Sequence, residues 1–208
     1  MRKSYEPFFE ETAKKFKYIQ LNEITNSITQ TPNFKKWFGK SKVVDTSGKP
    51  LVVFHGSNSN FNIFDSGKIG TNTDPGIWGK GFYFSDALTA RSYGSMVRGV
   101  YLSIENPFII EEGQTIEEIA EHLGIDESTL QVSRGFIRPK IQFINLFTGE
   151  IKYRGYDGII VNRPGKSKEY IAFHPNQIKS ADINNGNFSK ASDNIYETFI
   201  DSNRKYIN

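Results

Sequence analysis

The chain has 208 residues, a net charge of +3 and 37% hydrophobic residues, a composition typical of a soluble globular protein of one domain. The charge is too small to indicate nucleic-acid binding by itself, and the absence of cysteine excludes disulfides and thiolate chemistry. No apolar run is long enough to span a membrane, and the first residues, MRKSYEPFFEE, do not resemble a signal peptide, so we expect a cytoplasmic protein.

The N-terminal part of the chain predicts two helices before the first strands. Residues 4–21 carry apolar side chains at helical spacing. Thr31-Pro32 begins a short aromatic helix, NFKKWF, which Gly39 ends. The segments 42–44 and 51–54 then predict a hairpin around the turn DTSGKP.

A long loop rich in Asn, Gly, Ser and Asp, residues 57–80, follows this hairpin. Loops of this length inside a compact domain are commonly functional. The sequence then predicts a strand at 81–84, a helix from Asp86 to about Tyr93, and a strand at 97–104.

The C-terminal half predicts one well-marked helix and several strands. Thr115 and Glu118 form a capping box that begins the helix, and Gly124 ends it. A second capping box, Asn194 with Glu197, predicts a helical tail. Strands are expected at 139–146, 150–153, 157–162, 169–173 and 177–180.

These elements predict an α+β fold with many short strands and helices at the edges. The chain shows no repeats and no linker, so we expect a single domain spanning residues 1–208. Within it, residues 1–40 form an N-terminal helical extension, 41–181 a core and 182–208 a C-terminal helical tail.

Three short segments stand out as candidates for chemistry. They are Phe54-His55-Gly56-Ser57, then Gly79 to Ser85 followed by Tyr93, and Lys168 to Phe173, in which Glu169 begins an otherwise apolar strand. Each segment taken alone is more often explained by packing than by function. Their order, spacing and flanking residues together point to one site. His122 and His174 have no neighbours at metal-ligand spacing, so no metal site is predicted.

The three segments resemble the His–Tyr–Glu motif of the ADP-ribosyltransferases related to diphtheria toxin and the poly(ADP-ribose) polymerases. Residues 33–39, 53–57 and 175–181 further resemble a phage-associated branch of that family, found in polyvalent proteins. The resemblance covers about residues 33–181. It implies a split β-sheet core, mixed or antiparallel, with flanking helices, and NAD as the substrate without a metal.

The resemblance also implies a role for each motif residue. His55 binds a ribose hydroxyl on the adenosine side of NAD, and Tyr83 and Tyr93 stack on the nicotinamide ring. Gly56 presents its backbone to the nicotinamide carboxamide, to which Ser57 adds a hydrogen bond. Glu169 stabilises the oxocarbenium-like sugar, and with His55 and Tyr83 it forms the catalytic set.

The acceptor of the ADP-ribose is open between nucleic acid and protein. The loop 163–168 lies next to Glu169 in the sequence and carries three positive charges. We expect it to contact the acceptor through Arg163, Lys166, Ser167 and Lys168, with a mild preference for an anionic partner. Ser167 stands where arginine-modifying relatives carry Glu or Gln, so an arginine acceptor is not predicted.

Three functions of different classes follow from these observations. The favoured one is a mono-ADP-ribosyltransferase acting as a bacterial or phage toxin or anti-phage effector, held by an antitoxin. The second is an NAD glycohydrolase that uses water as the acceptor and depletes NAD. The third, a catalytically silent binding module, is the weakest because Glu169 is present.

Overall fold

A computed structural model describes residues 28–71, 76–133, 135–163, 165–182, 184 and 186–196. The helix expected at residues 4–21 lies outside these ranges. So does Glu197, one half of the expected C-terminal capping box.

The described residues form helices and strands in alternation. The α-helices are α2 (Pro32–Phe38), α3 (Ala87–Arg91), α4 (Ile116–Leu123) and α5 (Ile141–Tyr153), and the 3₁₀ turns are η1 (Ser66–Lys68), η2 (Glu127–Thr129) and η3 (Pro175–Gln177). The strands are β1 (Val53–Ser57), β2 (Phe82–Phe84), β3 (Met96–Leu102), β4 (Pro107–Ile110), β5 (Leu130–Ser133), β6 (Phe136–Pro139), β7 (Gly158–Val161), β8 (Glu169–Ala172) and β9 (Ile178–Ser180). No helix in the described ranges is long and apolar enough to cross a membrane.

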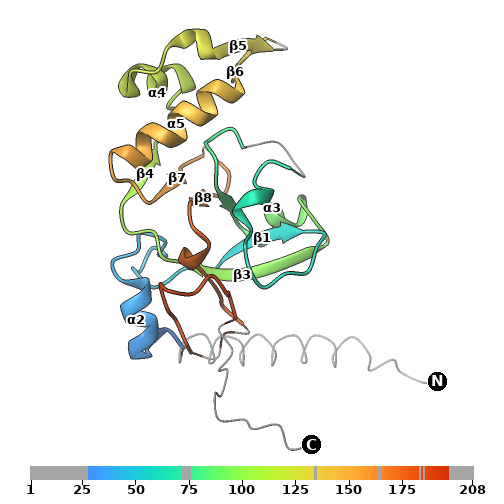
Figure 1. The fold of residues 1–208 in the computed structure, drawn as a ribbon, viewed down its shortest axis with the longest axis vertical. Coiled ribbons are helices and arrows are strands. Elements are labelled where there is room, and N and C mark those ends of the chain that lie inside the picture. The colour runs from blue at the N-terminus through green and yellow to red at the C-terminus, as the bar shows by residue number, and fades with distance from the viewer. Residues whose placement is uncertain are drawn as a thin grey trace, which may run out of the picture.

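The core is a split sheet. One half has the strand order β1-β3-β9 and is antiparallel, and the other has the order β2-β8-β7-β4 with β4 and β7 parallel. Phe54 and Ser85 join the halves, each backbone N–H donating to the other's carbonyl at 2.8 and 3.0 Å. The expected α+β class with a split mixed sheet is therefore confirmed (Figure 1).

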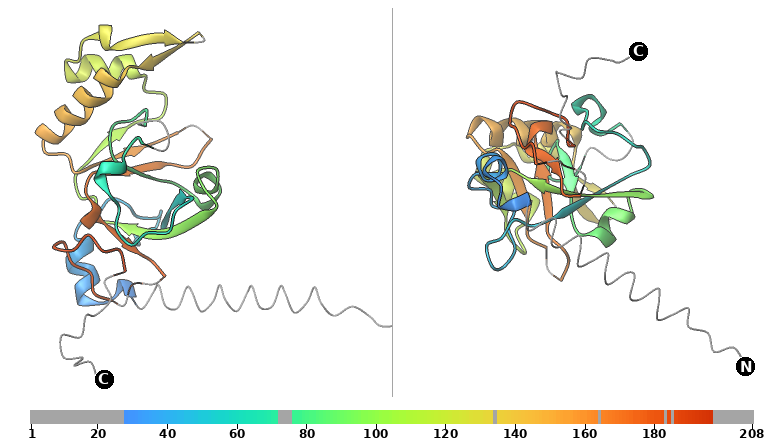
Figure 2. Two further views of the ribbon diagram at one scale, coloured as in Figure 1. Left: turned by 45° about the vertical axis from the view of Figure 1, so that its right-hand side comes forward. Right: turned by 90° about the horizontal axis from the view of Figure 1, so that it is seen from below.

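Two hydrophobic clusters hold this sheet. One combines side chains from both halves, such as Val100 of β3 and Phe82 of β2. The other joins the opposite face of β7 and β8 to α4 and α5, through residues such as Ile171 and Phe147. Figure 2 shows α4, α5 and the β5–β6 hairpin together at one end of the molecule and α2 at the other.

Local signals in the sequence account for three of the helices. The hydroxyl of Thr31 accepts the Phe34 N–H at the start of α2. In α4 both bonds of the capping box are present, and Gly124 ends the helix in the left-handed conformation. Asp86 caps α3 as expected, although that helix ends at Arg91.

The strands expected at 139–146 and 150–153 were wrong, because this segment is the single helix α5. Its β-branched and aromatic residues favour a strand when each is considered alone. Phe143, Phe147 and Ile151, however, recur every four residues and fill one face of the helix against the core. The expected hairpin at 42–54 is reduced to a single bridge between Val44 and Pro50, and β1 pairs instead with β3.

Candidate active site

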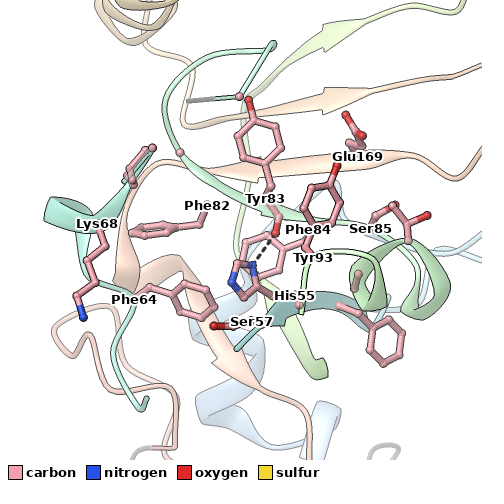
Figure 3. Close-up of a pocket in the computed structure, with 18 of the residues that line it drawn as sticks. His55, Ser57, Phe64, Lys68, Phe82, Tyr83, Phe84, Ser85, Tyr93 and Glu169 are labelled. Atoms are coloured by element: carbon pink, nitrogen blue, oxygen red, sulfur yellow. Dashed lines mark hydrogen bonds between the residues drawn. The ribbon is translucent and has the colours of Figure 1, made fainter. Parts of the chain in front are cut away.

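A pocket of about 620 Å³ opens where β1 and β2 part (Figure 3). It brings together the sequence-predicted residues from all three segments. His55, Gly56, Ser57, Tyr83, Tyr93, Arg163 and Glu169 line it. Lys166, Ser167 and Lys168 do not line it. Its volume lies in the range that small-molecule and cofactor sites occupy.

A hydrogen bond to the backbone holds the ring of His55 in one orientation. Its Nδ1 lies 2.9 Å from the carbonyl oxygen of Tyr83. Because a carbonyl only accepts, Nδ1 carries the proton, and Nε2 of the neutral ring is an acceptor. Burial lowers the pKa of His55 below its ordinary value of 6.5; the bond to Tyr83 acts the other way, and the charge of Arg98 adds a smaller lowering effect. The imidazole is therefore neutral at physiological pH.

A cluster of aromatic side chains, Phe61, Phe64 and Phe84, packs against this histidine. The rings of Phe64 and Phe84 lie 5.0 and 5.6 Å from the imidazole, and Phe61 contacts Phe64 at 4.9 Å. The guanidinium of Arg98 stacks over Phe61 at 4.4 Å. In the sequence, Phe84 belongs to the second candidate segment, whereas Phe61 and Phe64 are marked only by their place in an otherwise polar loop.

Gly56 is required by the fold. A Cβ at Gly56 would overlap the carbonyl oxygen of Ala90 in α3, and one at Gly94 would overlap the backbone of Ser57. The end of β1 and the turn after α3 therefore touch backbone to backbone. This contact places Tyr93, whose N–H donates to Ala90 at 3.0 Å, at the edge of the pocket.

The two tyrosines differ in how firmly they are held. The Tyr83 hydroxyl donates to the carbonyl of Gly79 at 2.7 Å. Gly76, with a φ of 84°, also lies so close to this ring that a Cβ there would overlap the hydroxyl. Tyr93 is 58% exposed. Figure 3 shows both tyrosines and Glu169 on the same side of His55.

The sheet register places Glu169 beside Tyr83. Glu169 begins β8 and pairs with Val161, while Ile171, two residues on, pairs with Tyr83. Residues two apart on a strand point to the same face, and paired residues share that face. The carboxylate and the Tyr83 ring therefore project from the same side of the sheet.

Arg163 forms an ion pair with Glu169, a contact that the motif did not predict. Its Nη1 lies 2.9 Å from Oε1 of Glu169, and the side chains are 33% and 13% exposed respectively. Only the six-residue separation of the two charges could have suggested it from the sequence. In this structure Arg163 faces the carboxylate, although we expected it to contact an acceptor.

The remainder of the loop is fastened to the start of α3. The Ser85 hydroxyl donates to the carbonyl of Lys168 at 2.9 Å, and the Ser167 hydroxyl donates to Asp86. The bond from Ser167, followed by the Thr89 N–H, lowers the pKa of Asp86. Lys166 and Lys168, just before the first residue of β8, are exposed.

Over the described ranges, no three side chains of the types that bind metals come together. His122 lies on α4, and His174 precedes η3. Neither lines the pocket.

Comparison with known proteins identifies one protein family. The family described as ADP-ribosyltransferase in polyvalent proteins matches residues 45–188, more than half of the chain. No curated protein matches the sequence. A crystal structure of an anti-CRISPR protein is similar at 17% identity with a TM-score of 0.34, over 62% of this chain and 91% of that one.

Proposed function

The chain belongs to the family of ADP-ribosyltransferases in polyvalent proteins, and we propose on this basis that it moves ADP-ribose from NAD to a macromolecular acceptor. The observation that carries the proposal is that His55, Tyr83 and Glu169, from three separate segments, line one pocket. We assign the catalytic unit to residues 41–181, with residues 1–40 and 182–208 as extensions of it.

Each wall of the pocket suits one part of NAD. Nε2 of the neutral His55 is an acceptor for a hydroxyl of the adenosine ribose. The backbone of Gly56 and the hydroxyl of Ser57 are polar groups for the nicotinamide carboxamide. Tyr83 and Tyr93 offer flat faces for stacking on the nicotinamide ring.

Glu169 supplies the charge that the reaction requires. As the bond between C1′ and the nicotinamide nitrogen breaks, nicotinamide leaves with the electron pair and the sugar becomes an oxocarbenium-like cation. A carboxylate beside that sugar stabilises the cation. The acceptor then forms a bond to C1′ with its own electron pair and releases its proton to Glu169 or to water.

Transfer to a macromolecule is favoured over hydrolysis by the charge of the loop that precedes Glu169. Lys166 and Lys168 of this loop are exposed, so an incoming nucleic acid or protein can contact them. An NAD glycohydrolase would use the same pocket with water as the acceptor. A binding module without activity is disfavoured because Glu169 is present and lines the pocket.

The test uses purified protein, cell extract and NAD labelled on its adenylate phosphate. Wild type and Glu169→Ala are compared, and the products are treated with nuclease or with protease. Label that nuclease removes identifies a nucleic-acid acceptor, and label that protease removes identifies a protein acceptor. Free ADP-ribose without labelled macromolecules supports the glycohydrolase. Intact NAD in both samples contradicts the proposal.

We further propose that the enzyme acts in the cytoplasm as a toxin or anti-phage effector restrained by an antitoxin. ADP-ribosylation without such a partner would harm the producing cell. Expression of the wild type is expected to stop growth, whereas Glu169→Ala is expected not to. Equal growth of both strains would contradict this role.

A further inference from the structure

The ion pair between Arg163 and Glu169 sets a full positive charge against the carboxylate on which the proposed reaction depends. The two atoms are 2.9 Å apart, and the Glu169 side chain is only 13% exposed. Water screens a sheltered pair less than it screens a surface pair. Both residues also line the pocket, so the charges act on whatever binds there.

This charge opposes the chemistry that Glu169 performs. The nicotinamide ring of NAD is cationic, and the positive charge moves onto the ribose as the glycosidic bond breaks. Glu169 stabilises that charge, but a guanidinium on the same carboxylate cancels much of its field. Charges a few ångströms apart in a partly buried site interact strongly enough to change a rate about tenfold.

The backbone of the loop around Arg163 is anchored at both ends. At its N-terminal end Asn162 donates its N–H to the carbonyl of Ile110 at 2.9 Å and its side-chain amide to Glu111 at 3.0 Å. The C-terminal end of the loop is fixed by the bonds from Ser85 to Lys168 and from Ser167 to Asp86. Arg163 lies at the N-terminal end, next to the pocket, with a third of its side chain exposed. An acceptor bound over the loop therefore reaches the guanidinium while Glu169 stays in place on β8.

We propose that Arg163 selects the macromolecular acceptor over water by masking Glu169 until the acceptor binds. The inference rests on the proposed function. Without an acceptor, the pair keeps the carboxylate neutralised and NAD hydrolysis slow. When an acceptor engages the guanidinium, Glu169 is released to stabilise the sugar cation. Arg163 is thus a specificity-determining residue of the same site.

The test compares Arg163→Gln and Arg163→Lys with the wild type. Arg154→Gln is the matched control, since it breaks another Arg–Glu pair, of 2.7 Å at the C-terminal end of α5, outside the pocket lining. Nicotinamide release without acceptor is measured across NAD concentrations, and labelling of extract is measured in parallel. Thermal melting verifies that each variant is folded.

Arg163→Gln is expected to raise acceptor-free NAD hydrolysis about tenfold and to lower KM for NAD, since a repelling charge is removed. Its ratio of labelled acceptor to hydrolysed NAD should fall. Arg163→Lys keeps the charge and should stay near the wild type, as should Arg154→Gln. A structural role would instead reduce kcat in Arg163→Gln.

The proposal is overturned if the wild type cleaves NAD and Arg163→Gln cleaves it no faster. That outcome leaves the proposed function intact, whereas a wild type that cleaves no NAD even with extract contradicts the function itself. If Arg163→Gln does not fold, Arg163→Met replaces it, and acceptor-free hydrolysis that is no faster in this variant than in the wild type overturns the proposal.

Discussion

The imidazole of His55 is tied to the backbone carbonyl of Tyr83, with 2.9 Å between Nδ1 and the carbonyl oxygen. This bond crosses the split between β1 and β2. It determines which ring nitrogen carries the proton and leaves Nε2 as an acceptor toward the pocket. The first two segments of the motif therefore depend on each other for their orientation.

NAD binding should resist mild acid because burial lowers the pKa of His55. As the pH falls through 6.5, an ordinary histidine would become charged and lose its acceptor nitrogen. We expect NAD affinity to stay constant there and to weaken only at lower pH. Equilibrium binding between about pH 5 and 8 measures this. Affinity that halves at pH 6.5 would contradict it.

The same shift predicts how folding stability depends on pH. Since the folded pKa lies below the unfolded value, the unfolded chain binds the proton more readily. Stability contributed by the neutral His55 is therefore complete above pH 6.5 and is lost as the pH falls toward the folded pKa. In His55→Gln this part of the loss should disappear when chemical denaturation is compared at several pH values.

Gly56→Ala should destabilise the protein by about 3 kcal/mol, because the added Cβ overlaps the carbonyl of Ala90 and must push α3 away. Gly149→Ala is the matched control. Gly149 lies within α5, and a Cβ there meets nothing within 4 Å. It should stabilise by about 0.5–1 kcal/mol, since alanine favours a helix. Urea unfolding of both variants tests the contrast, and equal stabilities would contradict it.

Tyr83→Phe and Tyr83→Ala separate the hydroxyl from the ring. Phenylalanine keeps the ring but removes the hydroxyl with its bond to Gly79, and it should cost about 1 kcal/mol in stability, with KM for NAD little changed. Alanine also removes the stacking face and should raise KM about tenfold. Steady-state kinetics and thermal melting distinguish the two effects. A Phe variant as impaired as Ala would show that the hydroxyl matters more than the ring.

Glu169→Gln should slow nicotinamide release by about 10²–10⁴-fold while NAD still binds, because the amide keeps the size but not the charge. Rates are measured by chromatography and binding by calorimetry. Glu150→Gln, which removes the partner of Arg154 on α5, is the control and should keep full activity. Loss of NAD binding in Glu169→Gln would place this residue in recognition instead of catalysis.

Short-range signals account for the elements that the sequence predicted well. Helix α4 has both halves of its capping box and a terminal glycine, all within ten residues. Helix α5 has no side-chain cap, since Lys140 stands at its start, and it is rich in residues that favour strands. Its helical form depends on packing against the sheet, for example against Phe108 of β4, which is distant in the sequence and contacts Phe147.

The features of the candidate site likewise divide into those that the sequence predicted and those that it did not. A family motif in the sequence predicted that His55, Tyr83 and Glu169 belong to one site, and the structure places them in one pocket. The sequence did not predict the ion pair of Arg163, because a pair across a loop depends on the path of the backbone between the two residues. The close approach of Gly56 to the carbonyl of Ala90 could not be predicted either, because a glycine in a sequence does not indicate which neighbouring residue requires it.

The bridge between Phe54 and Ser85 has a consequence for measuring motion in the pocket. Their reciprocal backbone bonds hold the two halves of the split sheet together beside His55. An opening of this seam releases both amides at once, so their protection factors against hydrogen–deuterium exchange should be similar and should rise together when NAD fills the pocket. The exchange of these two amide protons therefore reports how often the two halves of the sheet separate beside the pocket.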